Sequence, residues 1–277
     1  MPLQLAVPQP DGVIAEHTLF AGRDYVVGRS QGSDIVIANS KVSRQHASLR
    51  ARDDDSWLFT DTSSTGCYDN GMPVETTTIQ SPRVLHFGPV PCRLTPVSRK
   101  GLVKQDSQQV WRKQQLGRYH RQINRCDSTL ALVNVARECM QQTLHCERAA
   151  FILFDKQAGF QSSIGFQPWM EADSFSGSRT IISRCMEAGT PLAIGNIQQD
   201  TTLNTQQSIL QHGIKAALCV PVKIENDIVG VLYGDNTQGR VYFSDTDVRF
   251  ATSLGQFLSL RLLFQSIEHK ISLAACS

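Results

Sequence analysis

The stretch that decides the fold of this chain lies between residues 27 and 71, where four polar blocks alternate with short apolar runs. The blocks are Val27-Gly28-Arg29-Ser30, Val42-Ser43-Arg44-Gln45-His46, Asp61-Thr62-Ser63-Ser64-Thr65-Gly66 and Asp69-Asn70-Gly71. The apolar runs, such as residues 35–37 and 57–59, are short and bounded by turn-forming residues, as strands are. This alternation predicts an all-β sandwich that presents its polar blocks on loops.

The polar blocks gather side chains that suit a bound phosphate group. Arg29 and Arg44 supply guanidinium groups, while Ser43 and Thr65 supply hydroxyls. Charge-assisted hydrogen bonds are the strong ones, and loops at the ends of rigid strands hold donors at a defined spacing. Taken alone, each residue is an ordinary surface or turn residue. The spacing of the blocks together favours a phosphate site.

This order of blocks resembles the pattern of forkhead-associated (FHA) domains, which are all-β sandwiches that bind phosphothreonine peptides through their loops. The resemblance implies that Arg29 contacts the phosphate, Ser43 donates a hydrogen bond to it, Arg44 adds positive charge and Thr65 closes the pocket. It also implies structural roles for Gly28, His46, Asn70 and Gly71, with His46 bracing the loops and Asn70-Gly71 shaping the closing turn.

Two details of the resemblance concern the peptide rather than the phosphate. Lys41 occupies a position that in FHA domains helps to select the residue three places after phosphothreonine, and a cation there would favour an acidic residue. An ordinary surface lysine is the alternative. The asparagine that in this family follows the Ser-Thr pair and binds the peptide main chain is missing, because Thr65 is followed directly by Gly66. The resemblance therefore implies phosphate recognition with a weaker grip on the peptide backbone.

The whole chain has the length and composition of a two-domain globular protein. Its 277 residues are 41% hydrophobic and 19% charged. The eight cysteines include no Cys-x-x-Cys pair, which argues against a zinc ribbon and indicates reduced thiols. The first residues lack a basic region before an apolar core, and no apolar run has the length of a bilayer. We therefore expect a cytoplasmic protein with no membrane partner.

The charge distribution divides the chain into three parts. Residues 1–97 carry a net charge of −2, residues 98–125 carry 8 Lys and Arg against one Asp, and residues 126–277 carry a net charge of −3. This pattern predicts a β-sandwich over 1–97, a basic helical linker over 98–126 and a second domain over 127–277. Nucleic-acid binding is not expected of the basic segment, since no helix-turn-helix or zinc-finger signal accompanies it.

A seam of apolar residues begins in the basic segment and continues into the second domain. Residues Leu116, Tyr119, Ile123, Cys126, Leu130 and Val133 follow each other in alternating steps of three and four. This heptad spacing predicts one continuous helix that pairs with a second copy in a parallel homodimer. The alternative is an amphipathic helix that lies on its own domain.

The second domain shows helices around pairs of strands. We expect helices over 128–144, 176–188, 203–212 and 244–267, strands over 149–154, 160–164 and 191–194, and a hairpin over 217–233. Helices that flank an antiparallel sheet make an α+β fold. The succession resembles a GAF domain over residues 127–265, with the best local match at 219–222 and 228–236.

The ligand of such a domain is not evident from the residues. Asn236, Phe243 and Asp247 match a signature of GAF domains that bind cyclic nucleotides, but Thr237 and Val248 replace its lysine and glutamate. We therefore expect a dimerisation scaffold whose cavity is filled by its own side chains, with no cofactor or metal. A bound small molecule of unknown identity is the alternative.

Catalytic motifs are missing from the sequence. There is no Gly-x-Ser-x-Gly, Walker, His-Glu-x-x-His or kinase motif, so we expect a non-enzymatic signalling adaptor. The two resemblances imply a bacterial-type protein whose partner contains phosphothreonine, such as a Ser/Thr kinase or its substrate. In a homodimer, two weak phosphopeptide sites would gain avidity. The alternative is a ligand-gated regulator whose sandwich docks a partner independently of phosphorylation.

Overall fold

The computed structural model describes residues 1–10, 12–155, 159–170, 179–195, 213–239 and 242–275. It contains two compact units, Met1–Gln109 and Val110–Ser277, which are described here one at a time. The division falls inside helix α1 (Arg99–Asn124), so the helix of the expected linker contributes residues to both units.

Within the described ranges, no helix combines the length and the apolar character needed to cross a membrane.

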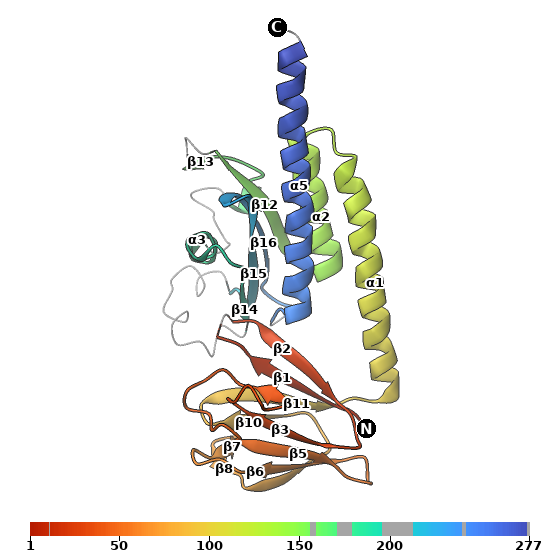
Figure 1. The fold of residues 1–277 in the computed structure, drawn as a ribbon, viewed down its shortest axis with the longest axis vertical. Helices are drawn as coiled ribbons and strands as arrows, with labels where there is room; N and C mark the ends of the chain where they lie inside the picture. The colour runs from red at the N-terminus through yellow and green to blue at the C-terminus, as the bar shows by residue number, and fades with distance from the viewer. Residues whose placement is uncertain (11, 156–158, 171–178, 196–212, 240–241, 276–277) are drawn as a thin grey trace. The chain divides into compact units, whose positions relative to one another are not determined.

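The first unit contains two β-sheets (Figure 1). Its strands are β1 (Leu3–Pro8), β2 (Ile14–Leu19), β3 (Asp24–Gly28), β4 (Ile35–Val36), β5 (Ala47–Ala51), β6 (Trp57–Asp61), β7 (Cys67–Asp69), β8 (Met72–Pro73), β9 (Thr76–Ile79), β10 (Arg83–Phe87) and β11 (Val90–Pro96). One sheet has the order β2-β1-β11-β10-β7-β8, and the other has the order β4-β3-β5-β6-β9. All pairs are antiparallel except β3 with the short strand β4.

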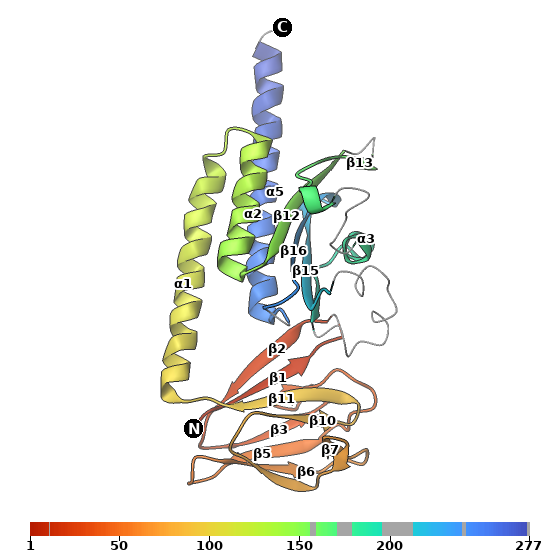
Figure 2. The ribbon, with the colours of Figure 1, turned by 180° about the vertical axis from the view of Figure 1, so that it is seen from behind.

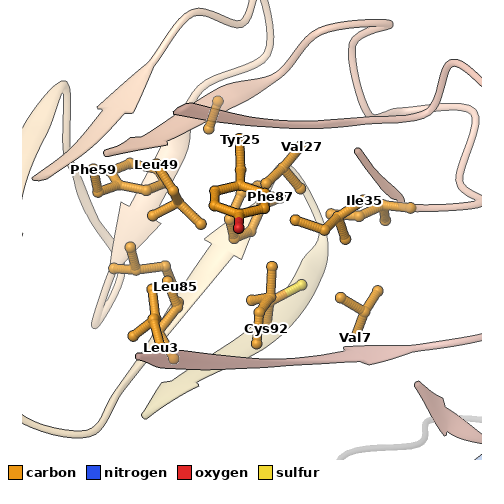
Figure 3. Packing of buried hydrophobic residues seen from close by; sticks show 14 of the residues in the cluster. Leu3, Val7, Tyr25, Val27, Ile35, Leu49, Phe59, Leu85, Phe87 and Cys92 are labelled. Carbon is orange, nitrogen blue, oxygen red and sulfur yellow. The ribbon is translucent and has the colours of Figure 1, made fainter. Parts of the chain in front are cut away.

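The core of this unit lies between the two sheets (Figure 3). In β1 every second residue is buried, so Leu3, Leu5 and Val7 face inward as the period of a strand requires. Phe59 of one sheet meets Phe87 of the other edge-on, with ring centroids 5.6 Å apart. This is the β-sandwich that the sequence predicts, and the prediction is confirmed.

The second unit combines one five-stranded antiparallel sheet with helices on both faces (Figures 1 and 2). The sheet has the order β13-β12-β16-β15-β14. Its elements are α2 (Thr129–Leu144), β12 (Arg148–Asp155), β13 (Gly159–Ile164), the 3-10 turn η1 (Pro168–Met170), α3 (Arg179–Ala188), β14 (Leu192–Gly195), β15 (Ala216–Ile224), β16 (Asp227–Asn236) and α5 (Asp245–Ala275). Helices α2 and α5 cover one face, and α3 covers the other. The expected α+β fold is confirmed.

Local chemistry explains where the two long helices of this unit begin. The Ser128 hydroxyl accepts a hydrogen bond from the N–H of Ala131 at 3.2 Å and caps α2. At the start of α5, the Ser244 N–H donates to the Asp247 carboxylate at 2.8 Å, which is the reciprocal bond of a capping box. The helix expected over 203–212 lies outside the described residues.

The expectation of one continuous seam from Leu116 to Val133 is wrong. Helix α1 ends at Asn124 and α2 begins at Thr129, and the chain reverses direction between them (Figure 1). Tyr119 of α1 is buried within the unit, and its hydroxyl donates a hydrogen bond to Glu138 of α2 at 3.3 Å. Tyr119, Ile123, Cys126 and Val133 are buried and Leu130 is 62% exposed, so most of the seam packs against its own domain, as the alternative has it.

The reversal has a physical cause in the segment between the helices. The N–H of Cys126 bonds to the carbonyl of Ile123 at 3.1 Å, which tightens and closes α1. The Cys126 carbonyl in turn accepts hydrogen bonds from Arg261 at 2.9 Å and Gln265 at 3.1 Å, both on α5. In a continuous helix the Cys126 carbonyl would accept a backbone N–H. Here the side chains of Arg261 and Gln265 supply its hydrogen bonds instead.

Candidate functional site

Three loops of the first unit lie side by side and carry the expected phosphate ligands. The Arg29 N–H, at the end of β3, donates to the Ser43 carbonyl at 3.0 Å, and the Ser30 N–H donates to the Arg44 carbonyl at 3.2 Å. Gly28 makes this contact possible, because a Cβ at residue 28 would lie 2.2 Å from the Arg44 carbonyl oxygen. The backbone thus holds the Arg29 loop against the Ser43-Arg44 loop.

The third loop, between β6 and β7, contacts the Ser43-Arg44 loop through the side chain of Ser43. The Ser43 hydroxyl oxygen accepts a hydrogen bond from the Ser64 N–H at 3.2 Å and lies 3.2 Å from the Ser64 hydroxyl oxygen. Ser64 was not among the residues expected to bind, although it belongs to the Ser64-Thr65 pair that carries the resemblance. Its neighbour Thr65 is exposed.

Thr65 and Lys41 approach each other at Gly88, where β10 ends. A Cβ at Gly88 would lie 3.2 Å from the Lys41 carbonyl oxygen, 3.7 Å from the Thr65 hydroxyl oxygen and 3.9 Å from the His46 ring. The positive φ of Gly88, 58°, is the backbone conformation that favours glycine there. Gly88 therefore lets the Lys41 segment and the Thr65 loop come together, and the sequence interpretation did not include it.

The site is open and cationic. The side chains of Arg29, Lys41 and Arg44 are exposed, and within the described part of the chain none of them forms an ion pair. By contrast, Arg23 and Arg50 on the same sheet are paired with Asp34 and Asp24. Three cations that have no carboxylate partner there lie on the same loops as the two serine hydroxyls or on loops bonded to them, an arrangement that suits an anion.

His46 connects the loops from beneath. Its Nδ1 accepts a hydrogen bond from the Ser43 N–H at 3.0 Å, and its backbone bonds to Val27 at 2.8 Å and Thr62 at 2.9 Å. The ring is fully buried, and burial lowers the pKa of His46 below its usual value, although the Asp61 carboxylate and the Gly66 backbone oppose the shift. Because Nδ1 accepts a hydrogen bond, the neutral ring carries its proton on Nε2.

His46, Asp61 and Cys67 bring their ligand atoms within 4.8 Å of one another, a spacing that a metal ion could use. The chemistry of the three groups disfavours this use. Asp61 accepts the N–H of Ser63 and of Cys67, each at 2.8 Å, with one carboxylate oxygen apiece. Burial, together with the Asp61 charge, raises the pKa of the Cys67 thiol, so it stays protonated. The cluster braces the loop from residue 61 to residue 67.

The backbone at Gly66, where the resemblance implies an asparagine, has a conformation and a neighbour that favour glycine. Gly66 has a φ of +83°, and a Cβ there would lie 3.1 Å from the hydroxyl oxygen of Tyr68. The Tyr68 hydroxyl lies beside the Thr65 carbonyl and donates to it at 3.4 Å. A side chain at residue 66 would therefore need both a rare backbone conformation and the displacement of Tyr68.

Asn70 and Gly71 form the two-residue turn between β7 and β8. Their φ angles are +49° and +81°, and Asp69 pairs with Met72 across the turn. Positive φ at both central residues is the requirement of a type I′ hairpin, for which Asn-Gly is the preferred pair. Both residues are exposed, and no hydrogen bond that the described residues show joins either of them to Ser43 or Ser64.

In the second unit, two of the three residues that match the cyclic-nucleotide signature have internal polar partners, and the third is buried. Asn236 donates to the His145 carbonyl at 2.8 Å, and Asp247 caps α5 and pairs with Arg112 at 2.6 Å. Phe243 is fully buried. The three residues that match the signature therefore have contacts or burial within the unit itself.

A buried charged cluster on the α3 face of the same sheet was missed by sequence reasoning. Arg148 of β12 pairs with the fully buried Asp235 of β16 through two hydrogen bonds of 2.7 and 2.8 Å, and the Tyr233 hydroxyl donates to Asp235 at 2.6 Å. The guanidinium of Arg148 lies 5.3 Å from the ring centre of Trp169. Arg148 and Asp235 are 87 residues apart in the sequence, and only the register of β12 against β16 brings them opposite each other.

Family models match both units. The model of the FHA domain matches residues 25–88, and the model of the GAF domain matches residues 129–262. Both families typically consist of regulatory domains without catalytic activity. No curated protein matches the chain.

Solved FHA structures cover the N-terminal third of the chain. The FHA domain of the CT664 protein from Chlamydia trachomatis is 29% identical and covers 35% of this chain and 100% of that one, with a TM-score of 0.33. The first FHA domain of Rv1747 from Mycobacterium tuberculosis is 28% identical and covers 34% and 97%, with a TM-score of 0.30. The N-terminal FHA domain of Rad53p from S. cerevisiae, solved with a phosphothreonine peptide, is 17% identical and covers 35% and 94%, with a TM-score of 0.31.

Proposed function

We propose that this protein, in which an FHA domain precedes a GAF domain, is a non-enzymatic signalling adaptor that binds a phosphothreonine-containing partner through Arg29, Ser43, Arg44 and Thr65. The partner would be a Ser/Thr kinase or a substrate of one. The C-terminal domain would hold two copies together, and it is the place where a small molecule would be sensed.

The observation that carries this proposal is the contact between Ser43 and Ser64, in a group of loops that also carries the exposed residues Arg29 and Arg44. The Ser43 oxygen accepts the Ser64 N–H and lies 3.2 Å from the Ser64 hydroxyl oxygen, so one of the two hydroxyls can donate to the other while the remaining O–H can donate to an anion. A phosphate placed there would meet hydroxyl donors and the unpaired charges of Arg29 and Arg44. These are the groups that bind a dianion most strongly, and loops on a rigid sandwich keep them in place.

A cytoplasmic location is part of the proposal. The seven cysteines in the described part of the chain are buried and form no disulfide, which suits a compartment that keeps thiols reduced.

The direct test is binding of a phosphothreonine peptide library to the wild type and to Arg29→Ala. Loss of a charge-assisted contact should weaken binding roughly ten- to a hundredfold. Arg93→Ala, which removes an exposed arginine from β11, is the matched control and should bind as the wild type does. The residue selected three places after phosphothreonine tests the role of Lys41, for which we expect an acidic side chain.

Unphosphorylated peptides and phosphoserine peptides complete the experiment. If the wild type shows no preference for phosphothreonine, the proposal fails.

A second candidate function is docking that does not depend on phosphorylation. Gly66, with Tyr68 against it, stands where the resemblance implies an asparagine that binds the peptide main chain. A partner bound equally well with and without phosphate, and equally by Arg29→Ala, would support this candidate, with the GAF domain as the regulated element.

A further inference from the structure

The C-terminal half of α5 carries a stripe of large apolar side chains that face solvent. We call Leu260, Leu263, Phe264, Ile267 and Ile271 the α5 stripe; their exposed fractions run from 38% to 63%. Leu260, Phe264, Ile267 and Ile271 are separated by steps of four, three and four, which is the spacing of a two-helix seam. Helices with this spacing bury their stripe against another helix.

The first part of α5 bonds to other elements of its own domain, whereas no hydrogen bond or ion pair shown by the described residues joins residues 266–271 to another element. Gln265 makes the final side-chain hydrogen bond to the body of the domain, at 3.1 Å from the Cys126 carbonyl. Every residue from 266 to 271 is exposed. In Figure 1 this end of α5 extends past the turn between α1 and α2. Its helical hydrogen bonds are thus supported by no packing, and short unsupported helical segments are marginal in water.

We propose that the α5 stripe is the surface through which two copies of this chain pair, each helix covering the stripe of the other. This deepens the dimerisation part of the proposed function and does not depend on phosphate binding. It also replaces residues 116–133 as the dimer surface, because Tyr119, Ile123, Cys126 and Val133 of that seam are buried within their own domain.

The area of the stripe is that of a dimer interface. Five large apolar side chains of about 150–250 Å² each, on average half exposed, present roughly 450 Å² of apolar surface. A standard interface buries about 800 Å² on each partner, of which somewhat more than half is apolar, or again roughly 450 Å². Few monomeric proteins leave a continuous patch of this size without a function.

The flanking charges suit a second copy of the same helix. No charged residue interrupts the stripe, and the charged neighbours Arg261 and Glu268 compensate each other within the helix at 3.3 Å. Two stripes can therefore face each other under two-fold symmetry without an uncompensated contact between these like groups. A strongly basic or acidic partner would find no complementary charge there.

The test is the molar mass of the full chain in solution, by light scattering and sedimentation, for the wild type and Ile267→Lys. We expect a dimeric wild type and a dissociation constant at least about thirtyfold higher for the variant, as for a residue at the centre of an interface. His269→Lys is the matched control, because residue 269 is exposed on the same helix but lies off the stripe. It should remain a dimer.

Two further readouts keep the test decisive. If Ile267→Lys folds poorly by circular dichroism, Ile271→Lys replaces it, since residue 271 is 63% exposed near the end of the helix. Amide exchange of residues 266–275 should be slow in the dimer and fast in either variant. A monomeric wild type, or a dimer that survives both substitutions, overturns the proposal.

The two proposals fail separately. Ile267→Lys should bind a monovalent phosphothreonine peptide as the wild type does, and Arg29→Ala should keep its dimer. A dimer that binds no phosphopeptide would therefore refute the phosphothreonine site and leave the α5 stripe standing.

Discussion

The Ser43 hydroxyl and the Ser64 N–H, which lie 21 residues apart in the chain, are joined by a hydrogen bond of 3.2 Å. This bond links the β4–β5 loop to the β6–β7 loop at the proposed phosphate site. It also makes the Ser43 oxygen an acceptor, and because the two serine hydroxyl oxygens lie 3.2 Å apart, the pair keeps one O–H that can donate to an anion.

Replacing Ser43 by alanine should therefore weaken phosphothreonine binding roughly tenfold or more, since a hydrogen bond to a charged group and the support of Ser64 are both lost. Titration calorimetry with a phosphothreonine peptide measures the change. Ser40→Ala removes an exposed hydroxyl from the same loop and should leave the affinity unaltered. Unchanged binding by Ser43→Ala would mean that the cations hold the phosphate without this hydroxyl.

The buried ring of His46 should make the FHA domain sensitive to mild acid. Burial lowers the pKa of His46 below its usual 6.5, against the opposing effects of Asp61 and the Gly66 backbone, so the unfolded state binds the proton more readily. The contribution of the neutral ring is complete above pH 6.5 and is lost as the pH falls below it. Protonation of Nδ1 would also break the bond from the Ser43 N–H.

Amide exchange of residues 47–61, followed at about pH 7.5 and about pH 5.5 and corrected for intrinsic rates, measures this effect. Protection in the wild type should decrease at the lower pH. His46→Asn cannot titrate and should show lower protection overall with a flatter pH dependence. A variant that loses protection as steeply as the wild type would assign the effect to another group.

The ionised carboxylate of Glu147 should stabilise the GAF domain, and this stabilisation should be lost at acidic pH. Its carboxylate accepts the N–H groups of Thr237, Gln238 and Gly239 at 2.8 to 3.1 Å and the Thr237 hydroxyl at 2.7 Å. Partial burial raises its pKa, but these donors outweigh burial and bring the pKa of Glu147 to about 2. The stabilisation is thus present above the ordinary value of 4.5 and disappears as the pH falls towards about 2.

Unfolding of Glu147→Gln by urea should show lower stability than the wild type at neutral pH, and the difference should narrow below pH 4.5. Glu187→Gln, an exposed substitution on α3, provides the comparison and should follow the wild type at every pH. A difference that is constant with pH would show that the charge of Glu147 does not matter.

Arg112 should fasten the second half of α1 to the C-terminal unit. Its guanidinium lies 2.6 Å from the carboxylate of Asp247, which is fully buried, and 3.2 Å from the Thr246 hydroxyl. Arg112→Ala would remove this guanidinium from beside a buried carboxylate, at a cost of about 3–5 kcal/mol. Denaturation of the full chain and amide exchange of residues 110–124 measure it, with Lys113→Ala as the exposed neighbour that should have little effect.

Much of the fold follows from local patterns in the chain. The inward alternation of β1, the Asn70-Gly71 turn and the serine caps of α2 and α5 each depend on residues within a few positions of one another. Such short-range chemistry is visible in a sequence. The spacing of the loop residues likewise indicated a phosphate site.

The heptad spacing of residues 116–133 is a case in which local patterns do not predict the structure. The period is correct for both halves, but nothing local distinguishes a continuous helix from two helices joined by a turn. The turn is held by Arg261 and Gln265 of α5, more than a hundred residues later in the chain. A contact of that range is not encoded in any local window.

By itself, the sequence determined the two fold classes, most of the strands and helices that build them and the polar blocks expected to bind phosphate, because these depend on side-chain period and turn chemistry. Only the tertiary structure decided that Ser64 joins Ser43, that Tyr68 lies against Gly66 and that Arg148 meets Asp235 in a buried pair. It also showed that Tyr119 and Ile123 of the heptad seam are buried and that the α5 stripe is exposed. The reason is physical: burial and hydrogen bonding between distant segments are settled by how sheets and helices pack, and a periodic pattern states only that a face will be covered, not by what.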